Sequence, residues 1–170
     1  MKRSRILKLV MLGALVAGLL VAATAVFAEH SWITPSGLQV HWKGDNLEPT
    51  VADRTRASLY NVPAAVNEWS GLGTPIQPRN TNGKKGQVTV GEGFSTEWLG
   101  LAQVFIEAGH VTKGKVTMNT TYLSGPDFGA FVADHVLAQE LGHIWGLDHN
   151  CDDLDTAMND CGDPSITTRA

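Results

Sequence analysis

Alternating apolar and polar positions predict several short strands in this chain. Leu38, Val40 and Trp42 alternate with polar residues, and this period of two predicts a half-buried strand over residues 37–42. Pairs such as Asn82-Gly83 and Lys113-Gly114 are typical of turns between strands. Four further strands are expected at residues 74–78, 87–90, 101–106 and 115–119.

A first helix is predicted where apolar residues recur at helical spacing. Thr50 is a candidate N-cap residue, and the pattern continues to Trp69 before Gly71 and Gly73 end it. Pro63 would kink this helix or start its second half, because proline lacks the backbone N–H that a helix interior needs. The residues that carry the pattern are Leu59, Val62, Val66 and Trp69.

A second helix is predicted from about Phe128, after a loop at residues 124–127. Leu137, Leu141 and Ile144 follow one another at i, i+4 and i+7 and predict a buried stripe. The residues expected on the opposite side are His135, Gln139 and His143. Five strands with two main helices, one after the first strand and one after the last, favour an α+β domain with an irregular C-terminal segment.

The first 28 residues have the pattern of a secretory signal peptide. Four basic residues precede an almost wholly apolar run from Leu9 to Phe27, and Val26-Phe27-Ala28 offers a cleavage site. Residues 29–170 would then form the exported domain. The alternative is an uncleaved membrane anchor through residues 6–27, because the apolar run is near the length that spans a bilayer.

Charge argues against nucleic acid as a partner. Loss of residues 1–28 would remove four of the 13 Lys/Arg and none of the 17 Asp/Glu, so 9 basic residues would face 17 acidic ones, a net charge of −8 with histidine neutral. An acidic chain without a basic run is a poor nucleic-acid binder. The remaining chain, about 142 residues, is long enough for one hydrophobic core. We expect a monomer.

Two cysteines, Cys151 and Cys161, lie close together near the C-terminus. In an exported protein such a pair favours a disulfide that closes a short loop. A Cys/His zinc knot that includes His149 is the alternative, although a second cysteine pair is missing. Five acidic residues lie nearby, but their spacing does not match a calcium-binding EF-hand loop, so a solvated acidic loop is expected. These residues are Asp152, Asp153, Asp155, Asp160 and Asp163.

The densest chemical pattern is residues 139–149, Gln-Glu-Leu-Gly-His-Ile-Trp-Gly-Leu-Asp-His. This segment resembles the zinc-binding motif of the metzincin metallopeptidases, H-E-x-x-H-x-x-G-x-x-H, at every specified position except the first. The matching residues are Glu140, His143, Gly146 and His149. Met158 follows where the family has its Met-turn, as a packing residue beneath the metal. Within the family, the chain is similar to small matrixin-like peptidases over about residues 38–160.

The resemblance implies a twisted mixed sheet, a polypeptide substrate and Zn²⁺ as cofactor. Residues 100–102, 109–111 and 116–119 are similar to the strands that precede the active-site helix, and the last of them is expected at the sheet edge beside the substrate. Trp69, near the end of the first helix, also fits the family.

The spacing of the motif has a physical reason. Helical positions four apart face the same way, so side chains at 139 and 143 can hold one ion. Gly146 permits the positive φ that turns the chain back, so that His149 supplies a third ligand. Zinc with three protein ligands and one open position lowers the pKa of water to about 7, and Glu140 would be the general base.

Gln139 stands where the first zinc-binding histidine is expected. An amide oxygen is a poorer donor than imidazole for zinc, so we expect weak metal binding. His135 lies eight residues before His143, a rise of about 12 Å, too far to share the ion. His30, His41 and His110 have no assigned role.

Three functional hypotheses follow. The first is a secreted zinc endopeptidase with Glu140 as base, His143 and His149 as ligands, and Gln139 as a weak ligand. The second is an inactive pseudopeptidase that binds peptides or a protein partner. The third is a membrane-tethered form of either. Asn119-Thr120-Thr121 is also a glycosylation sequon, although it falls in a predicted strand.

Overall fold

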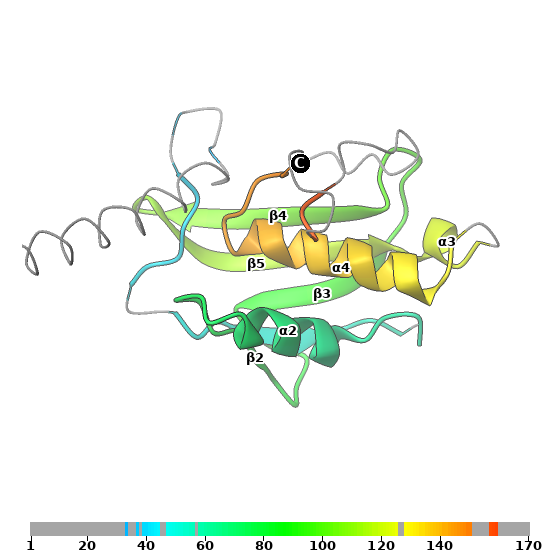
Figure 1. The fold of residues 1–170 in the computed structure, drawn as a ribbon, viewed down its shortest axis with the longest axis horizontal. Coiled ribbons are helices and arrows are strands. Elements are labelled where there is room, and N and C mark those ends of the chain that lie inside the picture. The colour runs from blue at the N-terminus through cyan, green and yellow to red at the C-terminus, as the bar shows by residue number, and fades with distance from the viewer. Residues whose placement is uncertain are drawn as a thin grey trace, which may run out of the picture. The chain divides into compact units, whose positions relative to one another are not determined.

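The computed structural model describes residues 33, 37, 39–44, 47–56, 58–125, 128–150 and 157–159, all within one compact unit (Figure 1). The predicted signal segment, Cys151, Cys161 and the five aspartates lie outside the described residues. Within the described part of the chain, no helix is long and apolar enough to cross a membrane.

A five-stranded mixed sheet forms one layer, as predicted. The strand order is β2-β1-β3-β5-β4. Neighbours pair in parallel from β2 through β5, and only β4 runs antiparallel to its neighbour. The strands are β1 (Thr50–Asp53), β2 (Arg79–Asn80), β3 (Val88–Gly93), β4 (Gly100–Glu107) and β5 (His110–Asn119).

β4 is an edge strand of the sheet, with β5 as its neighbour. The expectation that residues 116–119 form this edge is therefore wrong, because β5 lies between β3 and β4. β4 and β5 form a hairpin whose turn residues, Ala108 and Gly109, have φ of 50° and 82°. Two successive positive φ angles give the strand-matching twist of a type I′ turn.

Lys113-Gly114 is not a turn, contrary to prediction, since it lies inside β5. A Cβ atom at Gly114 would lie 2.7 Å from Ile144 Cγ2. This glycine therefore allows a helix to approach the strand closely.

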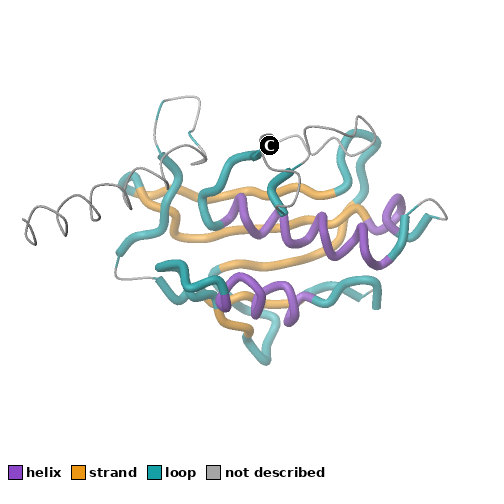
Figure 2. The backbone as a smooth tube through the Cα atoms, viewed as in Figure 1, coloured by secondary structure: helices purple, strands orange, loops and turns teal. Residues whose placement is uncertain are grey.

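Three described helices accompany the sheet: α2 (Val62–Gly71), α3 (Thr120–Leu123) and α4 (Ala130–Ile144). In Figures 1 and 2, α2 and α4 lie on the same side of the sheet, with α4 packed on β4 and β5 and α2 on β1 and β2. The two helices also touch each other, since Trp69 Nε1 donates to Ala138 O at 3.0 Å. The architecture agrees with the α+β prediction.

The first helix starts later than predicted. Thr50 belongs to β1, because Thr50 and Val51 pair with β2. Val51 and Ala52 pair with β3 on the other side, and both are buried. α2 is instead capped by Asn61, whose Oδ1 accepts from Ala64 N at 3.1 Å, and Pro63 occupies its first turn. Of the two options for Pro63, the start of the second half of the predicted helix agrees with the start of α2, whereas the expected first half contains β1.

In place of the strand expected at residues 37–42, Gln39 and Trp42 form isolated bridges, and the predicted alternation holds over residues 39–42. Val40 and Trp42 are buried whereas Gln39 and His41 are exposed. Residues 74–78 are not a strand either, and the short β2 follows them.

The predicted stripe of α4 is confirmed, because Leu137, Leu141 and Ile144 are fully buried. The expected polar side is not solvated, since Gln139 and His143 are buried too. The second half of α4 is buried on all sides, so its polar side chains are kept away from water. Each of these groups needs a hydrogen-bond partner within the protein or a bound ligand.

Candidate functional site

The end of α4 has the turn that the motif predicts. Gly146 has φ of 95°, Gly146 N donates to His143 O at 3.0 Å, and Leu147 N donates to Gly142 O at 3.0 Å. These two bonds are those of a Schellman motif, which satisfies the last carbonyls of a helix. A Cβ atom at Gly146 would clash with Val40 O. Glycine is therefore required here for both conformation and space.

The turn brings His149 back to His143. Their Nε2 atoms are 3.0 Å apart and their ring centroids 4.7 Å apart, with the rings inclined at 69°. Two imidazoles that bind one ion through nitrogens at about 2.0–2.1 Å place those nitrogens roughly 2.9–3.4 Å apart. This spacing would suit two ligands of one metal ion, and it is also the length of an N–H···N hydrogen bond between the two rings.

The orientation of His143 is fixed by the backbone. His143 Nδ1 is 2.8 Å from Leu147 O. Since a carbonyl oxygen only accepts, Nδ1 carries the proton and Nε2 of the neutral ring presents a lone pair toward His149. Metal-ligating histidines have such a partner on the second nitrogen. Leu147 contributes to this site only through its backbone carbonyl, so no side-chain motif in the sequence indicated its role.

Gln139 lies one helical turn before His143 and is 0% exposed. Among the described residues, neither Oε1 nor Nε2 of its amide has a hydrogen-bond partner. A buried polar group without a partner costs about 1–3 kcal/mol. The amide is thus costly to stability unless it binds something else.

Glu140 is 2% exposed and lies against the start of the edge strand. A Cβ atom at Gly100 would be 2.6 Å from both Cγ and Oε1 of Glu140. Gly100 therefore leaves room for the carboxylate next to β4, a role that the sequence did not indicate.

Met158 packs against α4 at Gly142. It is buried, and a Cβ atom at Gly142 would clash with its sulfur and lie 3.1 Å from Trp69 Cζ2. Asn150 N donates to Met158 O at 3.0 Å and fixes the returning chain. Gly142, an unspecified position of the motif, thus seats Met158 and Trp69 against α4.

Two other histidines come together away from this site. His41 and His110 have ring centroids 4.8 Å apart. His135 is half-buried in the first half of α4, and His30 lies outside the described residues. Asn119 of the sequon is fully buried, and its Nδ2 donates to Ser95 O at 2.7 Å and to Trp98 O at 2.8 Å, so it is a structural residue in the folded chain.

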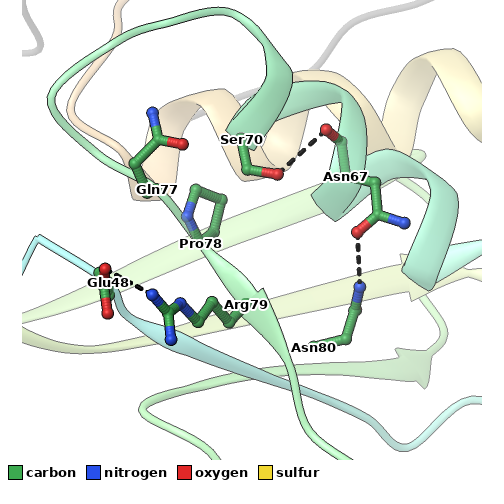
Figure 3. Close-up of a pocket in the computed structure, with 7 residues that line it drawn as sticks. All are labelled: Glu48, Asn67, Ser70, Gln77, Pro78, Arg79 and Asn80. Atoms are coloured by element: carbon green, nitrogen blue, oxygen red, sulfur yellow. Dashed lines mark hydrogen bonds and ion pairs between the residues drawn. The ribbon is translucent and has the colours of Figure 1, made fainter.

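A cavity of about 380 Å³ lies between α2 and β2 (Figure 3). Its polar groups satisfy one another: Arg79 pairs with Glu48 at 2.6 Å, and Asn80 Nδ2 donates to Asn67 Oδ1 at 3.3 Å. It is lined by Glu48, Asn67, Ser70, Gln77, Pro78, Arg79 and Asn80. The side chains that line this cavity are therefore less suited to catalysis or metal binding than those at the end of α4.

No group of three or more His, Cys, Asp or Glu side chains that could hold a metal occurs in the described part of the chain. The end of α4 brings two imidazoles together, and Gln139 lies one helical turn before the first of them. No protein-family model matches the chain. No curated protein matches it either.

Proposed function

We propose that the protein is an exported, metzincin-like zinc endopeptidase, matrixin-like in type, whose activity is limited by Gln139. The observation that carries the proposal is the histidine pair of α4. His143 and His149 approach to 3.0 Å between Nε2 atoms, and Leu147 O holds His143 in the tautomer that binds metals.

The residues present fit a zinc ion in part. His143 and His149 would supply two nitrogens, and Gln139 would supply an amide oxygen as a weak third ligand. The partnerless, buried amide of Gln139 supports this role, because a ligand bond would offset the cost of its burial. Zinc bound there would supply a Lewis acid and a water of lowered pKa.

Glu140 is the proposed general base. Its carboxylate lies beside Gly100, where β4 begins, and β4 is the edge strand. An extended peptide that pairs with this edge would pass close to the carboxylate, because added strands align along the edge backbone. Glu140 would then take a proton during attack on the peptide carbonyl.

A pseudopeptidase that binds peptides without cutting them is the second candidate. The observation that favours it is the amide at position 139, since zinc prefers imidazole to a neutral amide oxygen. The same fold and edge strand would then serve binding alone.

The deciding experiment restores the missing imidazole. Gln139→His should tighten zinc binding at least 10–100-fold, the range for perturbing even a supporting partner, and should raise cleavage of a protein substrate. Glu140→Ala in that background should keep the zinc and lose turnover. His143→Ala in that background should lose the gain in affinity.

The two candidates give different results for the unaltered chain. Stoichiometric zinc and cleavage that a chelator abolishes support the peptidase, whereas a folded protein without measurable turnover supports the pseudopeptidase. If Gln139→His binds zinc no better than the unaltered chain, residues 139–149 do not form a metal site and the metzincin-like proposal is wrong.

Export is proposed from the N-terminal pattern. N-terminal sequencing of protein from the producing cell should begin at Glu29, whereas membrane-bound protein that retains Met1 would support the tethered form.

A bridge between Cys151 and Cys161 should lower the intact mass by two hydrogens and contribute on the order of 2–3 kcal/mol.

A further inference from the structure

A second histidine pair lies where residues 40–42 meet the start of β5. The rings of His41 and His110 have centroids 4.8 Å apart and are inclined at 86°. The two residues are 69 positions apart in sequence, so only the fold brings them together. Neither residue contributes to the proposed peptidase site.

The backbone fixes both histidines in place. Val111 N donates to His41 O at 2.8 Å, and Trp42 forms a parallel bridge with Val111. Trp42 and Val111 are buried in the core, whereas His41 is exposed and His110 is half-buried. Since neighbouring residues of extended chain point to opposite sides, the two histidines share the outer side of this junction.

One nitrogen of each ring has no hydrogen-bond partner among the described residues. His41 Nδ1 is 2.9 Å from Gln39 O, so Nδ1 carries the proton and Nε2 of the neutral ring has a free lone pair. His110 Nδ1 is shielded from water and has no hydrogen-bond partner among the described residues. An imidazole nitrogen in that position is costly unless a ligand satisfies it.

The ring separation fits a shared ion. Two imidazoles that bind one ion through nitrogens at about 2.0–2.1 Å have centroids roughly 4.5–5.2 Å apart. The separation of 4.8 Å lies in this range, as does the 4.7 Å of the α4 pair. We propose that His41 and His110 form a second metal site, which takes one late transition-metal ion, with water completing its coordination.

Imidazole ligands suit Cu²⁺, Ni²⁺ and Zn²⁺. A site with only two protein ligands imposes little geometry, so its preference should follow the intrinsic order in which Cu²⁺ binds more tightly than Ni²⁺ or Zn²⁺. Calcium and magnesium should not bind, because they require oxygen ligands.

An ion there would tie the segment that carries His41 to β5. Val40, the preceding residue, contacts Gly146, and Trp42 Nε1 donates to Ile144 O at 2.8 Å. The same segment therefore supports the end of α4. Metal binding at the second site should stabilise the folded chain by mass action, and the thermal midpoint should rise with metal concentration.

The test uses the full chain with His143→Ala and His149→Ala, so that the α4 pair is absent. Cu²⁺ is titrated by calorimetry, and the bound ion is examined by electron paramagnetic resonance for coupling to two ring nitrogens. His41→Gln or His110→Gln added to this chain should remove one Cu²⁺ equivalent or weaken it about tenfold or more. His135→Gln, the matched control on the surface of α4, should change nothing.

Three results are decisive. Loss of one equivalent and of the two-nitrogen signal in both variants supports the site. Unchanged Cu²⁺ binding in folded His41→Gln and His110→Gln chains overturns it. Equal losses in the His135→Gln control also overturn it, because binding would then follow the histidine count and not this pair.

Discussion

The two histidine pairs have nearly the same ring separation but opposite surroundings. His143 and His149 lie at the end of a helix, and His143 is 2% exposed beside a buried amide and a buried carboxylate. His41 and His110 lie on the outer side of the sheet, with His41 exposed. The ring geometry of both pairs would suit a shared ion, whereas a reaction also needs a positioned carboxylate in a shielded place.

The segment 40–42 connects the two pairs, so the largest effect is expected where it meets α4. Gly146→Ala should cost about 2–5 kcal/mol, since alanine is strained at positive φ and its Cβ would clash with Val40 O. Gly73→Ala is the matched control, because Gly73 has φ of 70° with nothing within 4 Å of its Cβ position. It should cost only about 1–2 kcal/mol.

Denaturant unfolding measures both variants, and metal titration then shows which histidine pair is affected. Equal stability losses in the two alanine variants would mean that the Val40 contact contributes nothing.

The next largest effect distinguishes the role of the Glu140 carboxylate from that of the histidine pair. Gly100→Ala should displace Glu140, because the new Cβ would lie 2.6 Å from its carboxylate. Misplacement by about 1 Å can reduce turnover about 100-fold, and overpacking should cost about 1–3 kcal/mol. Zinc affinity should change little, since the imidazoles do not move.

Gly91→Ala is the control for Gly100→Ala, because a Cβ atom there would meet nothing within 4 Å. Rates and affinities are best compared in the Gln139→His background. An unchanged cleavage rate in Gly100→Ala would argue against Glu140 as the base.

A substitution at Gln139 tests whether this residue lowers the stability of the fold and serves metal binding instead. Gln139→Met keeps the shape and removes a buried amide without partners, so the metal-free protein should gain about 1–3 kcal/mol. Zinc affinity should fall at the same time. Chemical denaturation without metal measures the gain.

Asn119→Leu removes a buried amide whose nitrogen is satisfied, although its Oδ1, like the Gln139 amide, has no hydrogen-bond partner among the described residues. Its Nδ2 donates two hydrogen bonds to backbone carbonyls, so its loss should destabilise the fold by about 1–3 kcal/mol. A loss of stability in Gln139→Met as well would show that the Gln139 amide does have a stabilising partner.

The smallest expected effect is the difference in metal-free stability between variants of the two histidine pairs. His143→Ala should cost about 1–3 kcal/mol, because His143 is buried and bonded to Leu147 O. His41→Ala should stay within about 0.5 kcal/mol, as for other exposed positions. Thermal unfolding in chelator checks both, and equal losses would remove the structural difference between the pairs.

Local patterns predicted the parts of the fold that depend on near neighbours in sequence. The buried stripe of α4, the alternation at residues 39–42 and the positive φ of Gly146 all follow from spacing within a few residues. The prediction failed at Thr50, where helical and strand spacing are both possible and pairing with β2 and β3 decides. It also failed at Lys113-Gly114, where the glycine makes room for Ile144.

The approach of His149 to His143 follows from the local sequence, because the two residues are close in the chain and the helix end at Gly146 brings their imidazoles together. Three other features depend on the tertiary structure: the room that Gly100 leaves for Glu140, the burial of Gln139, and the contact of His41 with His110. The physical reason is that these contacts join segments far apart in sequence. Their geometry depends on strand order and helix packing, which no local spacing encodes.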